Sequence, residues 1–156
     1  MIRIEKAARD DRDTVLGLVE KLLRELEDSP DEFAGLEPGR VARDLEAAGD
    51  RFTAFLARSD SGEAVGIATL FESFAIYAGG SYGIIDEKYV DPAWRGAGVG
   101  RSLLQAVAEH GRRRGWVRID VTAPPEKRWE RTVRFYEREG FVFTGPKLRL
   151  MLARER

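Results

Sequence analysis

The stretch YVDPAWRGAGVG, residues 89–100, has the residue types that bind an anion through the protein backbone. Its three glycines, Gly96, Gly98 and Gly100, alternate where an apolar run ends and a helical pattern begins. The first N–H groups of a helix have no partner inside the helix, and the helix dipole makes that end positive. Because glycine has no side chain, a bulky anion can come close to these N–H groups. The stretch therefore predicts a pyrophosphate site, and the alternative is a glycine-rich turn that binds no ligand.

Two arginines flank the loop, and its spacing differs from that of two other phosphate-binding motifs. Arg95 and Arg101 could each bind phosphate oxygens through a forked guanidinium. A dinucleotide fingerprint requires G-x-G-x-x-G, whereas the spacing here is G-x-G-x-G. A Walker A loop ends in G-K-[ST], which Gly100-Arg101-Ser102 does not match. The pattern that does fit is R-x-x-G-x-G, after a strand that ends in YV-D-P.

The elements that must position this loop follow from the hydrophobic periodicity. A strand over 81–90 leads into the loop, and a helix begins at Val99 and ends before Gly115. Before them we expect a strand at 1–7, a helix capped near Asp10 or Asp11 and ended by Ser29-Pro30, a helix over 38–48, and a hairpin of strands 51–58 and 63–73. After them we expect a strand at 116–121, a helix at 128–139 and two closing strands at 141–145 and 147–153. This order indicates an α/β mixture with an antiparallel start and a central β-α-β unit.

Composition narrows the class of protein. The 156 residues suit a single domain over 1–156, and 26 basic against 27 acidic residues argue against a nucleic-acid binder. The chain has no cysteine and a single histidine, His110, which excludes disulfides, a thiolate nucleophile and Cys- or His-rich metal sites. His110 lies mid-helix without an evident acidic partner and is expected to be solvated or half-buried. There is neither a signal-peptide core nor a run of eighteen apolar residues, so we expect a cytoplasmic protein without a membrane span.

Two stretches resemble the motifs of one family. YVDPAWRGAGVGRSLL, residues 89–104, resembles the acetyl-CoA-binding motif of the GNAT superfamily of N-acetyltransferases, and FYEREGF, residues 135–141, resembles its second signature. The resemblance in element order extends over essentially the whole chain. It implies an α/β (α+β) fold with a mixed, mostly antiparallel central sheet of six to seven strands and about four helices on its two faces.

The resemblance also implies a reaction and a set of coenzyme contacts. It implies transfer of an acetyl group from acetyl-CoA, the co-substrate, directly to a primary amine, since no cysteine exists to carry an acyl intermediate. No metal is implied. The backbone of residues 90–93 would pair with the pantetheine arm, and the Val90 N–H would donate to the thioester oxygen. The implied coenzyme contacts are Val90, Asp91, Arg95, Gly96, Ala97, Gly98, Val99, Gly100 and Arg101.

Three side chains are candidates for proton transfer. Tyr136 stands where the family keeps a tyrosine that donates to the departing thiolate, and the alternative is that Phe135 and Tyr136 form an apolar pair. Asp86 and Glu87 are the carboxylates nearest the expected reaction centre, and because side chains alternate along a strand, only one of them can face it. We favour Glu87, on the face of Tyr89, as base or amine anchor. A water chain is the alternative base, and a strand-face salt bridge is the alternative role.

The chain departs from the family at one position, and the acceptor is not specified. Trp129 stands where the family often has asparagine, so it either stacks on the coenzyme or caps its helix. The acidic segment 25–38 would attract a cationic amine, or is simply a solvated loop. Dimers are common in the family, so a homodimer is compatible with the resemblance. Two other functions stay open: a catalytically silent acyl-CoA-binding domain and an unrelated nucleotide-binding enzyme.

Overall fold

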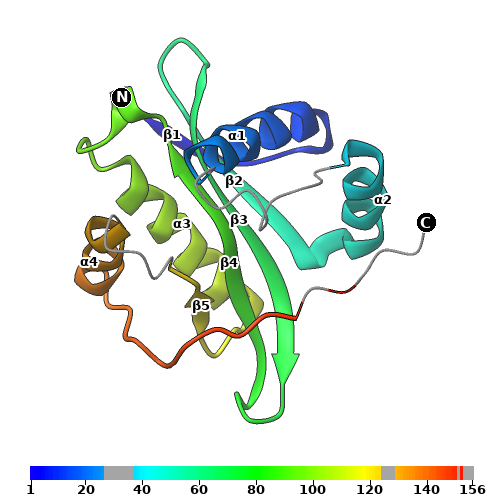
Figure 1. The fold of residues 1–156 in the computed structure, drawn as a ribbon. Helices are drawn as coiled ribbons and strands as arrows, with labels where there is room; N and C mark the ends of the chain where they lie inside the picture. The colour runs from blue at the N-terminus through cyan, green and yellow to red at the C-terminus, as the bar shows by residue number, and fades with distance from the viewer. Residues whose placement is uncertain (27–36, 124–128, 151, 153–156) are drawn as a thin grey trace. The chain divides into compact units, whose positions relative to one another are not determined.

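The structure, a computed structural model, describes residues 1–26, 37–123, 129–150 and 152. Contacts divide the chain into two units, Met1–Val121 and Thr122–Arg156. The first unit holds the sheet and three helices (Figure 1). Its elements are β1 (Arg3–Lys6), α1 (Arg12–Glu25), α2 (Pro38–Ala48), β2 (Phe52–Arg58), β3 (Ala64–Ala75), β4 (Gly80–Val90), α3 (Val99–Arg114) and β5 (Ile119–Val121). Within its described residues, the second unit holds α4 (Glu130–Arg138).

The described strands form one sheet in the order β1-β2-β3-β4-β5. Neighbours from β1 to β4 are antiparallel, and β5 runs parallel to β4. The β-α-β unit predicted from sequence is therefore β4-α3-β5, and α3 is the crossover that a parallel pair requires. This confirms the mixed, mostly antiparallel sheet.

Helix α1 covers one face of the sheet. Its apolar stripe, at the i, i+3, i+4 spacing, packs on alternate residues of three strands. The core of this face, which we call the α1 face, comprises Val15, Leu18, Val19, Ala54, Leu56, Ile67 and Tyr89.

Helix α3 covers the opposite face, which we call the α3 face. Its buried residues include Val99, Leu103, Leu104 and Val107. Gly66 of β3 lies under the start of the helix, where an added Cβ would come within 3.3 Å of Val99 Cγ1 and 3.2 Å of the Tyr89 carbonyl oxygen. Glycine at this position therefore lets α3 begin close to β4.

His110 is more buried than the sequence predicted. It is 8% exposed, and its ring lies edge-on to Phe55 and Trp116, with centroids 5.7 and 5.3 Å away. Its Nε2 lies 3.5 Å from Thr53 Oγ1. The aromatic partners come from β2 and from beyond α3, so the local sequence of the helix does not reveal them.

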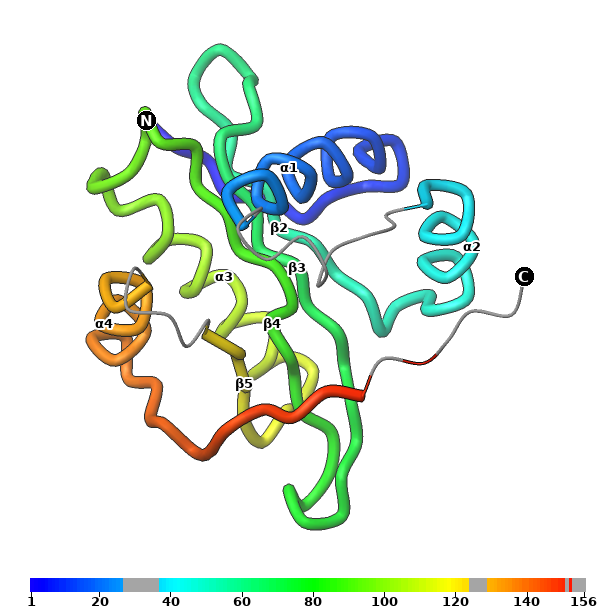
Figure 2. Tube along the Cα trace, viewed as in Figure 1, coloured from blue at the N-terminus to red at the C-terminus, as the bar shows by residue number. Residues whose placement is uncertain are grey.

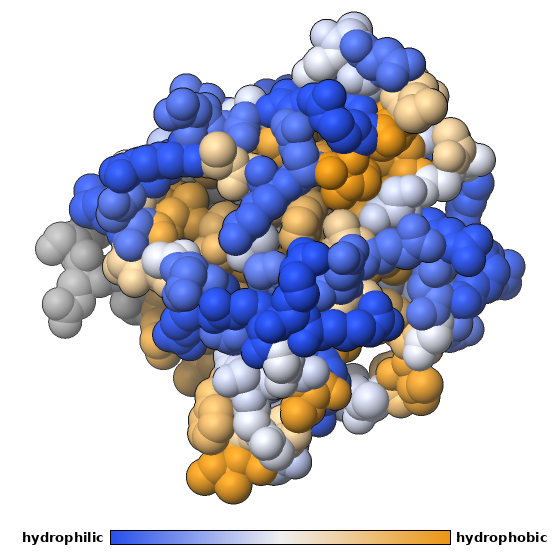
Figure 3. Space-filling model, turned by 180° about the vertical axis from the view of Figure 1, so that it is seen from behind, coloured by the Kyte–Doolittle hydropathy of each residue, from blue (hydrophilic) through white to orange (hydrophobic). Residues whose placement is uncertain are grey.

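The β3–β4 hairpin is longer than predicted, because the strands continue to Ala75 and restart at Gly80. Its tip exposes Phe74, Ile76 and Tyr77, and apolar surface is visible at this end of the molecule, at the bottom of the view in Figure 3. Arg118 lies over the Tyr77 ring, 5.0 Å from its centroid, and donates to its hydroxyl.

The prediction of six to seven strands is wrong, since five strands are found over the described residues. Residues 141–150 form neither helix nor strand (Figure 2), and residues 151 and 153 lie outside the described part. Leucines alternate with polar residues at 148, 150 and 152, as in a half-buried strand, but each of these leucines is at least 80% exposed. The alternating leucines therefore do not pack against a core, as those of a half-buried strand would. The predicted strand at 116–121 shortens to the three residues of β5.

Candidate functional site

A β-bulge in β4 shapes the centre of the candidate site. Leu70 of β3 pairs with Ile85 and Thr69 pairs with Glu87, so Asp86 is an extra residue between two paired ones. Ile85 therefore shares the face of Leu70, whereas Glu87 shares the face of Thr69 and Ile67, which is the α1 face. The predicted sharing of a face by Glu87 and Tyr89 is confirmed by this register. Asp86 was expected to face the side of the sheet opposite to Glu87 by regular alternation, but the bulge interrupts that alternation and makes Asp86 the additional residue.

Glu87 is fixed by a single neighbour on β3. The Thr69 hydroxyl donates to Glu87 Oε2 and accepts the backbone N–H of Glu87 at 3.0 Å. Thr69 is 1% exposed. Burial raises the pKa of the Glu87 carboxyl, the hydrogen bond from Thr69 opposes this rise, and the charge of Asp86 adds to it. A carboxylate with a raised pKa is a stronger base than an exposed one.

The two residues beside Glu87 differ from it. Asp86 is exposed, as the extra residue of a bulge often is. Lys88 pairs with Ala68 on the α3 face and is half-buried. Burial, with a smaller effect from the charge of Arg95, lowers the pKa of Lys88 to about 8.

The edge of β4 beyond the bulge has no strand beside it in the described part of the chain. Pairing with β5 covers only Gly83 to Ile85 of β4, although β4 continues to Val90. The backbone N–H of Asp91 donates to the Val65 carbonyl on β3 at 2.8 Å. Because backbone groups of a strand alternate in direction, the N–H of Lys88 and Val90 point toward the open edge. An extended ligand could pair with them as a further strand would.

Arg95 closes the end of this edge. Its Nε donates to the Val90 carbonyl at 2.8 Å, and its Nη2 lies 2.5 Å from Glu25 Oε1 at the end of α1. The guanidinium also lies 5.8 Å from the centre of the Tyr89 ring. In this structure the Arg95 side chain thus bridges α1 and β4, and its backbone N–H donates to the Pro92 carbonyl.

The glycine loop has a backbone conformation that favours glycine. Gly96 and Gly98 have φ of 79° and 83°, in the left-handed region where glycine is favoured. Gly98 is the N-cap of α3 and has no side-chain cap, and a Cβ added there would meet nothing within 4 Å. The exposed loop therefore leaves room beside the first N–H groups of α3. These features fit the pyrophosphate of a coenzyme.

Asp91 and Lys21 support the turn between β4 and the loop. Asp91 Oδ1 accepts the backbone N–H of Ala93 at 3.0 Å and caps a short turn of 3₁₀ helix, Pro92–Trp94. Its Oδ2 lies 4.0 Å from Lys21 Nζ on α1. Asp91 thus orders the turn from which the loop departs.

The second unit holds the two remaining predicted site residues. Tyr136 on α4 is 6% exposed, and its ring lies edge-on to Phe135 and Phe141 at 5.4 and 5.3 Å. Burial raises the pKa of the Tyr136 phenol, so the phenol is a weaker acid than that of an exposed tyrosine. Trp129 is half-buried and is the N-cap residue of α4, without a side-chain cap.

The first unit brings together the predicted residues from Asp86 to Arg101. Sequence reasoning missed Thr69, Lys88 and Lys21, and it placed Glu25 in the acidic segment without its partner Arg95. Thr69 is a polar residue inside the apolar run of β3, which is a signal that could have drawn attention to it. Glu25 is separated from Arg95 by 70 residues, and nothing in the sequence pairs them. Of the acidic segment 25–38, residues 27–36 lie outside the described part.

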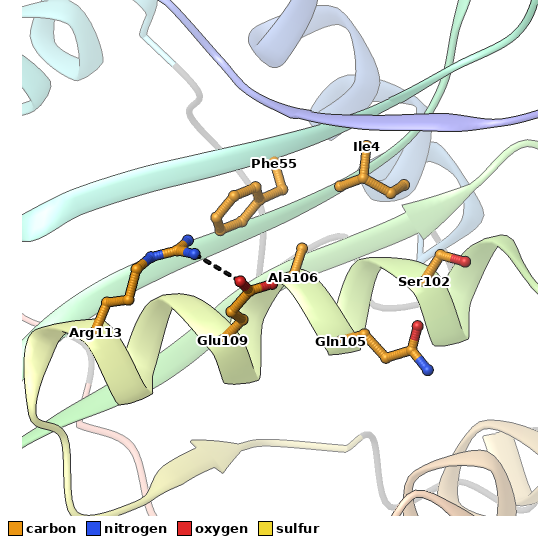
Figure 4. Close-up of a pocket in the computed structure, with 7 residues that line it drawn as sticks. All are labelled: Ile4, Phe55, Ser102, Gln105, Ala106, Glu109 and Arg113. Atoms are coloured by element: carbon orange, nitrogen blue, oxygen red, sulfur yellow. Dashed lines mark hydrogen bonds and ion pairs between the residues drawn. The ribbon is translucent and has the colours of Figure 1, made fainter.

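A shallow cavity of about 350 Å³ lies elsewhere, between α3 and the β1–β2 edge (Figure 4). Arg113 and Glu109 pair at one end of it, 2.9 Å apart. None of its lining residues is a predicted site residue: Ile4, Phe55, Ser102, Gln105, Ala106, Glu109 and Arg113.

The described residues offer neither a metal-binding cluster nor a membrane-spanning helix. No cluster of three His, Asp or Glu side chains with metal-binding geometry occurs among them. None of their helices has the length and apolar character needed to cross a membrane.

Comparison with known proteins agrees with this geometry. A profile of the acetyltransferase (GNAT) domain matches residues 50–143. A glucosamine 6-phosphate N-acetyltransferase of Trypanosoma brucei brucei is 29% identical over 133 residues, which are 85% of this chain and 86% of the relative.

Two solved structures share the fold. An aminoglycoside acetyltransferase from an uncultured soil metagenomic sample has a TM-score of 0.81 and 20% identity, and the match covers 98% of this chain and 99% of the other. The structure of AAC(6')-Iy with the bisubstrate analogue CoA-S-monomethyl-acetylneamine has a TM-score of 0.75 and 21% identity, with 100% and 99% covered. Since the profile matches more than half of its length, this chain belongs to the GNAT acetyltransferase family, and it is an N-acetyltransferase.

Proposed function

We propose that this protein transfers an acetyl group from acetyl-CoA directly to a primary amine of an amino sugar. The observation that carries the proposal is the open edge of β4, with Glu87 at the bulge on one side and the exposed start of α3 beyond it. The edge offers a strand partner to an extended pantetheine arm, and the helix start offers N–H groups to a pyrophosphate.

In the proposed reaction, Glu87 is the proton acceptor and Tyr136 is the proton donor. Glu87 accepts a proton from the acceptor amine, whose nitrogen attacks the carbonyl carbon of the thioester. The negative charge on the carbonyl oxygen is stabilised by the Val90 N–H, which points toward the open edge. The C–S bond then breaks, and the coenzyme thiolate takes a proton from the Tyr136 phenol. The second proton that the amine nitrogen loses returns to the phenolate, and Glu87 releases its proton to solvent. Asp86 is exposed beside this centre and is proposed to attract the cationic amine.

The acceptor class rests on the similar proteins. A relative named for glucosamine 6-phosphate and structures named for aminoglycosides share an amino sugar as acceptor. Glu87 adds negative charge on the α1 face, which favours a cationic acceptor.

The test is a panel of amines incubated with acetyl-CoA, with release of free thiol as the readout. The panel contains glucosamine, glucosamine 6-phosphate, an aminoglycoside, single amino acids and a peptide with a free N-terminus. We expect thiol release with at least one amino sugar, at a rate that saturates with both substrates.

Thiol release with the peptide alone would reject the amino-sugar class but keep the transferase. Binding of acetyl-CoA without acetyl transfer to any amine of a broadened panel would favour the silent acyl-CoA-binding alternative. Each result thus decides between named functions.

A further inference from the structure

Thr69 makes two hydrogen bonds to one residue. Its hydroxyl accepts the backbone N–H of Glu87 and donates to Oε2 of the same residue. A hydroxyl has a single hydrogen, and the N–H contact uses an oxygen lone pair, so the hydrogen is directed to the carboxylate. The side chain and the main chain of Glu87 are thereby fixed to the same atom of β3.

The hydrogen bond between Thr69 and Glu87 lies in a buried part of the sheet. Thr69 is 1% exposed and pairs with Ala54 on one side and Glu87 on the other. The next pair on the same face, Ile67 and Tyr89, is 0% and 6% exposed. Thr69 therefore lies in dry surroundings, where a hydrogen bond to a charged group is stronger than in water, and Glu87 itself is half-buried.

We infer that Thr69 is a positioning residue of the acetyl transfer, which directs Oε1 of Glu87 to the acceptor amine and keeps the carboxylate ionised. The inference rests on the proposed role of Glu87. It specifies which oxygen takes the proton, because Oε2 is held by the Thr69 hydroxyl.

The bulge explains why Thr69, and no neighbour, has this role. In a regular ladder Thr69 would lie opposite Asp86, the residue after Ile85. The extra residue places Glu87 opposite Thr69 instead and brings the backbone N–H of Glu87 within 3.0 Å of the hydroxyl. The bulge and the threonine thus fix the candidate base together.

The experiment compares Thr69→Val with Thr69→Ser and with a control, Thr53→Val. Valine keeps the shape of threonine and removes the hydroxyl, whereas serine keeps the hydroxyl. Thr53 is 3% exposed in β2, and its hydroxyl contacts His110 on the α3 face, so its loss removes a buried hydroxyl of the same sheet away from Glu87. Each variant is assayed for kcat and KM over pH, after circular dichroism has shown the same thermal unfolding cooperativity.

We expect Thr69→Val to lower kcat at least tenfold and to move the acidic limb of the pH profile to higher pH, because the bond that opposes protonation is gone. The KM for acetyl-CoA should stay within twofold. Thr69→Ser and Thr53→Val should keep the wild-type limb. A Thr69→Val protein with the wild-type kcat and limb would overturn the inference.

A second measurement separates this inference from the proposed function. The Glu87 carboxyl is titrated by ¹³C NMR in the wild-type and Thr69→Val proteins, with no substrate present. A pKa that is higher in Thr69→Val supports the hydrogen bond even if the amine panel shows no transfer. An unchanged pKa overturns the inference even if the enzyme is active.

Discussion

At the scale of single residues, burial has opposite consequences for the two proposed proton carriers. It raises the pKa of the Glu87 carboxyl and that of the Tyr136 phenol. For the carboxyl, the shift makes a better proton acceptor. For the phenol, the shift makes a weaker proton donor, so transfer of its proton to the thiolate depends on the phenolate regaining a proton from the amine nitrogen.

We predict that Glu87→Gln reduces turnover about 100-fold or more and also stabilises the fold. The ionised, half-buried carboxylate destabilises the native state above its raised pKa, and this penalty disappears as pH falls through that pKa. The amide has no charge and can still accept from Thr69. Calorimetry should therefore show a Tm a few degrees higher than wild type at pH 8, and a smaller difference at pH 5.

The control for this variant is Glu63→Gln, at an exposed carboxylate in the β2–β3 turn. It should change neither turnover nor Tm. A lower Tm of Glu87→Gln at pH 8 would contradict the account of a buried, penalised charge.

We predict that Tyr136→Phe lowers turnover by about 100-fold with little change in the KM for acetyl-CoA. Phenylalanine keeps the ring contacts with Phe135 and Phe141 and removes the donor. Steady-state kinetics measure both constants, and Tyr77→Phe, at the exposed hairpin tip, is the control. Unchanged turnover would assign Tyr136 to packing alone.

At the scale of elements, α1 and α3 meet the same strand from opposite faces. Helix α3 begins beside the end of β4, and α1 holds that end through Lys21–Asp91 and Glu25–Arg95. These surface pairs contribute little stability individually, since exposed ion pairs are worth about 0–1 kcal/mol. Their effect is to fix the direction in which the chain leaves β4.

We predict that acetyl-CoA raises Tm and that Gly98→Glu abolishes the rise. At 100 times the Kd, a ligand contributes about 2.7 kcal/mol, which corresponds to roughly 5–10 °C for a protein of this size. A glutamate at the start of α3 places a carboxylate where the pyrophosphate would lie. Differential scanning fluorimetry measures the shift.

Gly62→Glu is a matched control for Gly98→Glu. Gly62 has φ of 86° against 83° for Gly98, and a Cβ at either position meets nothing within 4 Å. Both variants thus have the same backbone strain, and only one lies at the start of α3. A wild-type shift in Gly98→Glu would exclude the helix start as the binding site.

Helix ends could be predicted from the sequence better than strands or long-range contacts. The bounds of the helix over 38–48 and of α3 agree with the prediction, because Gly49, Gly98 and Gly115 are local signals at helix ends. The closing strands were wrong, since alternation alone does not supply a neighbouring strand. The bulge at Asp86 and the partner of Arg95 arise from pairing across the sheet and from 70 residues away, which no local pattern encodes.

At the scale of the whole molecule, a single histidine reports on the packing between α3 and the sheet. His110 is the only histidine in the sequence, and burial lowers its pKa, as do the charges of Lys6, Arg114 and Arg113. Glu72 opposes them.

We predict that the His110 ring titrates below 6.5 in the folded protein, which NMR can follow because the chain has one imidazole. The contribution of His110 to the free energy of unfolding is then fully present above pH 6.5. It decreases as pH falls toward the lowered pKa, because the unfolded chain binds the proton at a higher pH than the folded one. His110→Phe keeps the contacts with Phe55 and Trp116 and should lose less Tm than wild type between pH 7.5 and 5.5. Equal losses in the two proteins would contradict this assignment.

The bulge in β4 has a consequence for how this protein can change. Ile85 and Glu87 lie on opposite faces of the sheet although two positions separate them in sequence, because Asp86 occupies the additional place. The bulge therefore depends on the presence of an additional residue at this point, and not on which side chain that residue has. Many amino acids at position 86 would keep the faces of β4 and its divergence from β5 at Ile85. Deletion of Asp86 would instead place Glu87 directly after Ile85 and make the β3–β4 ladder regular at this point.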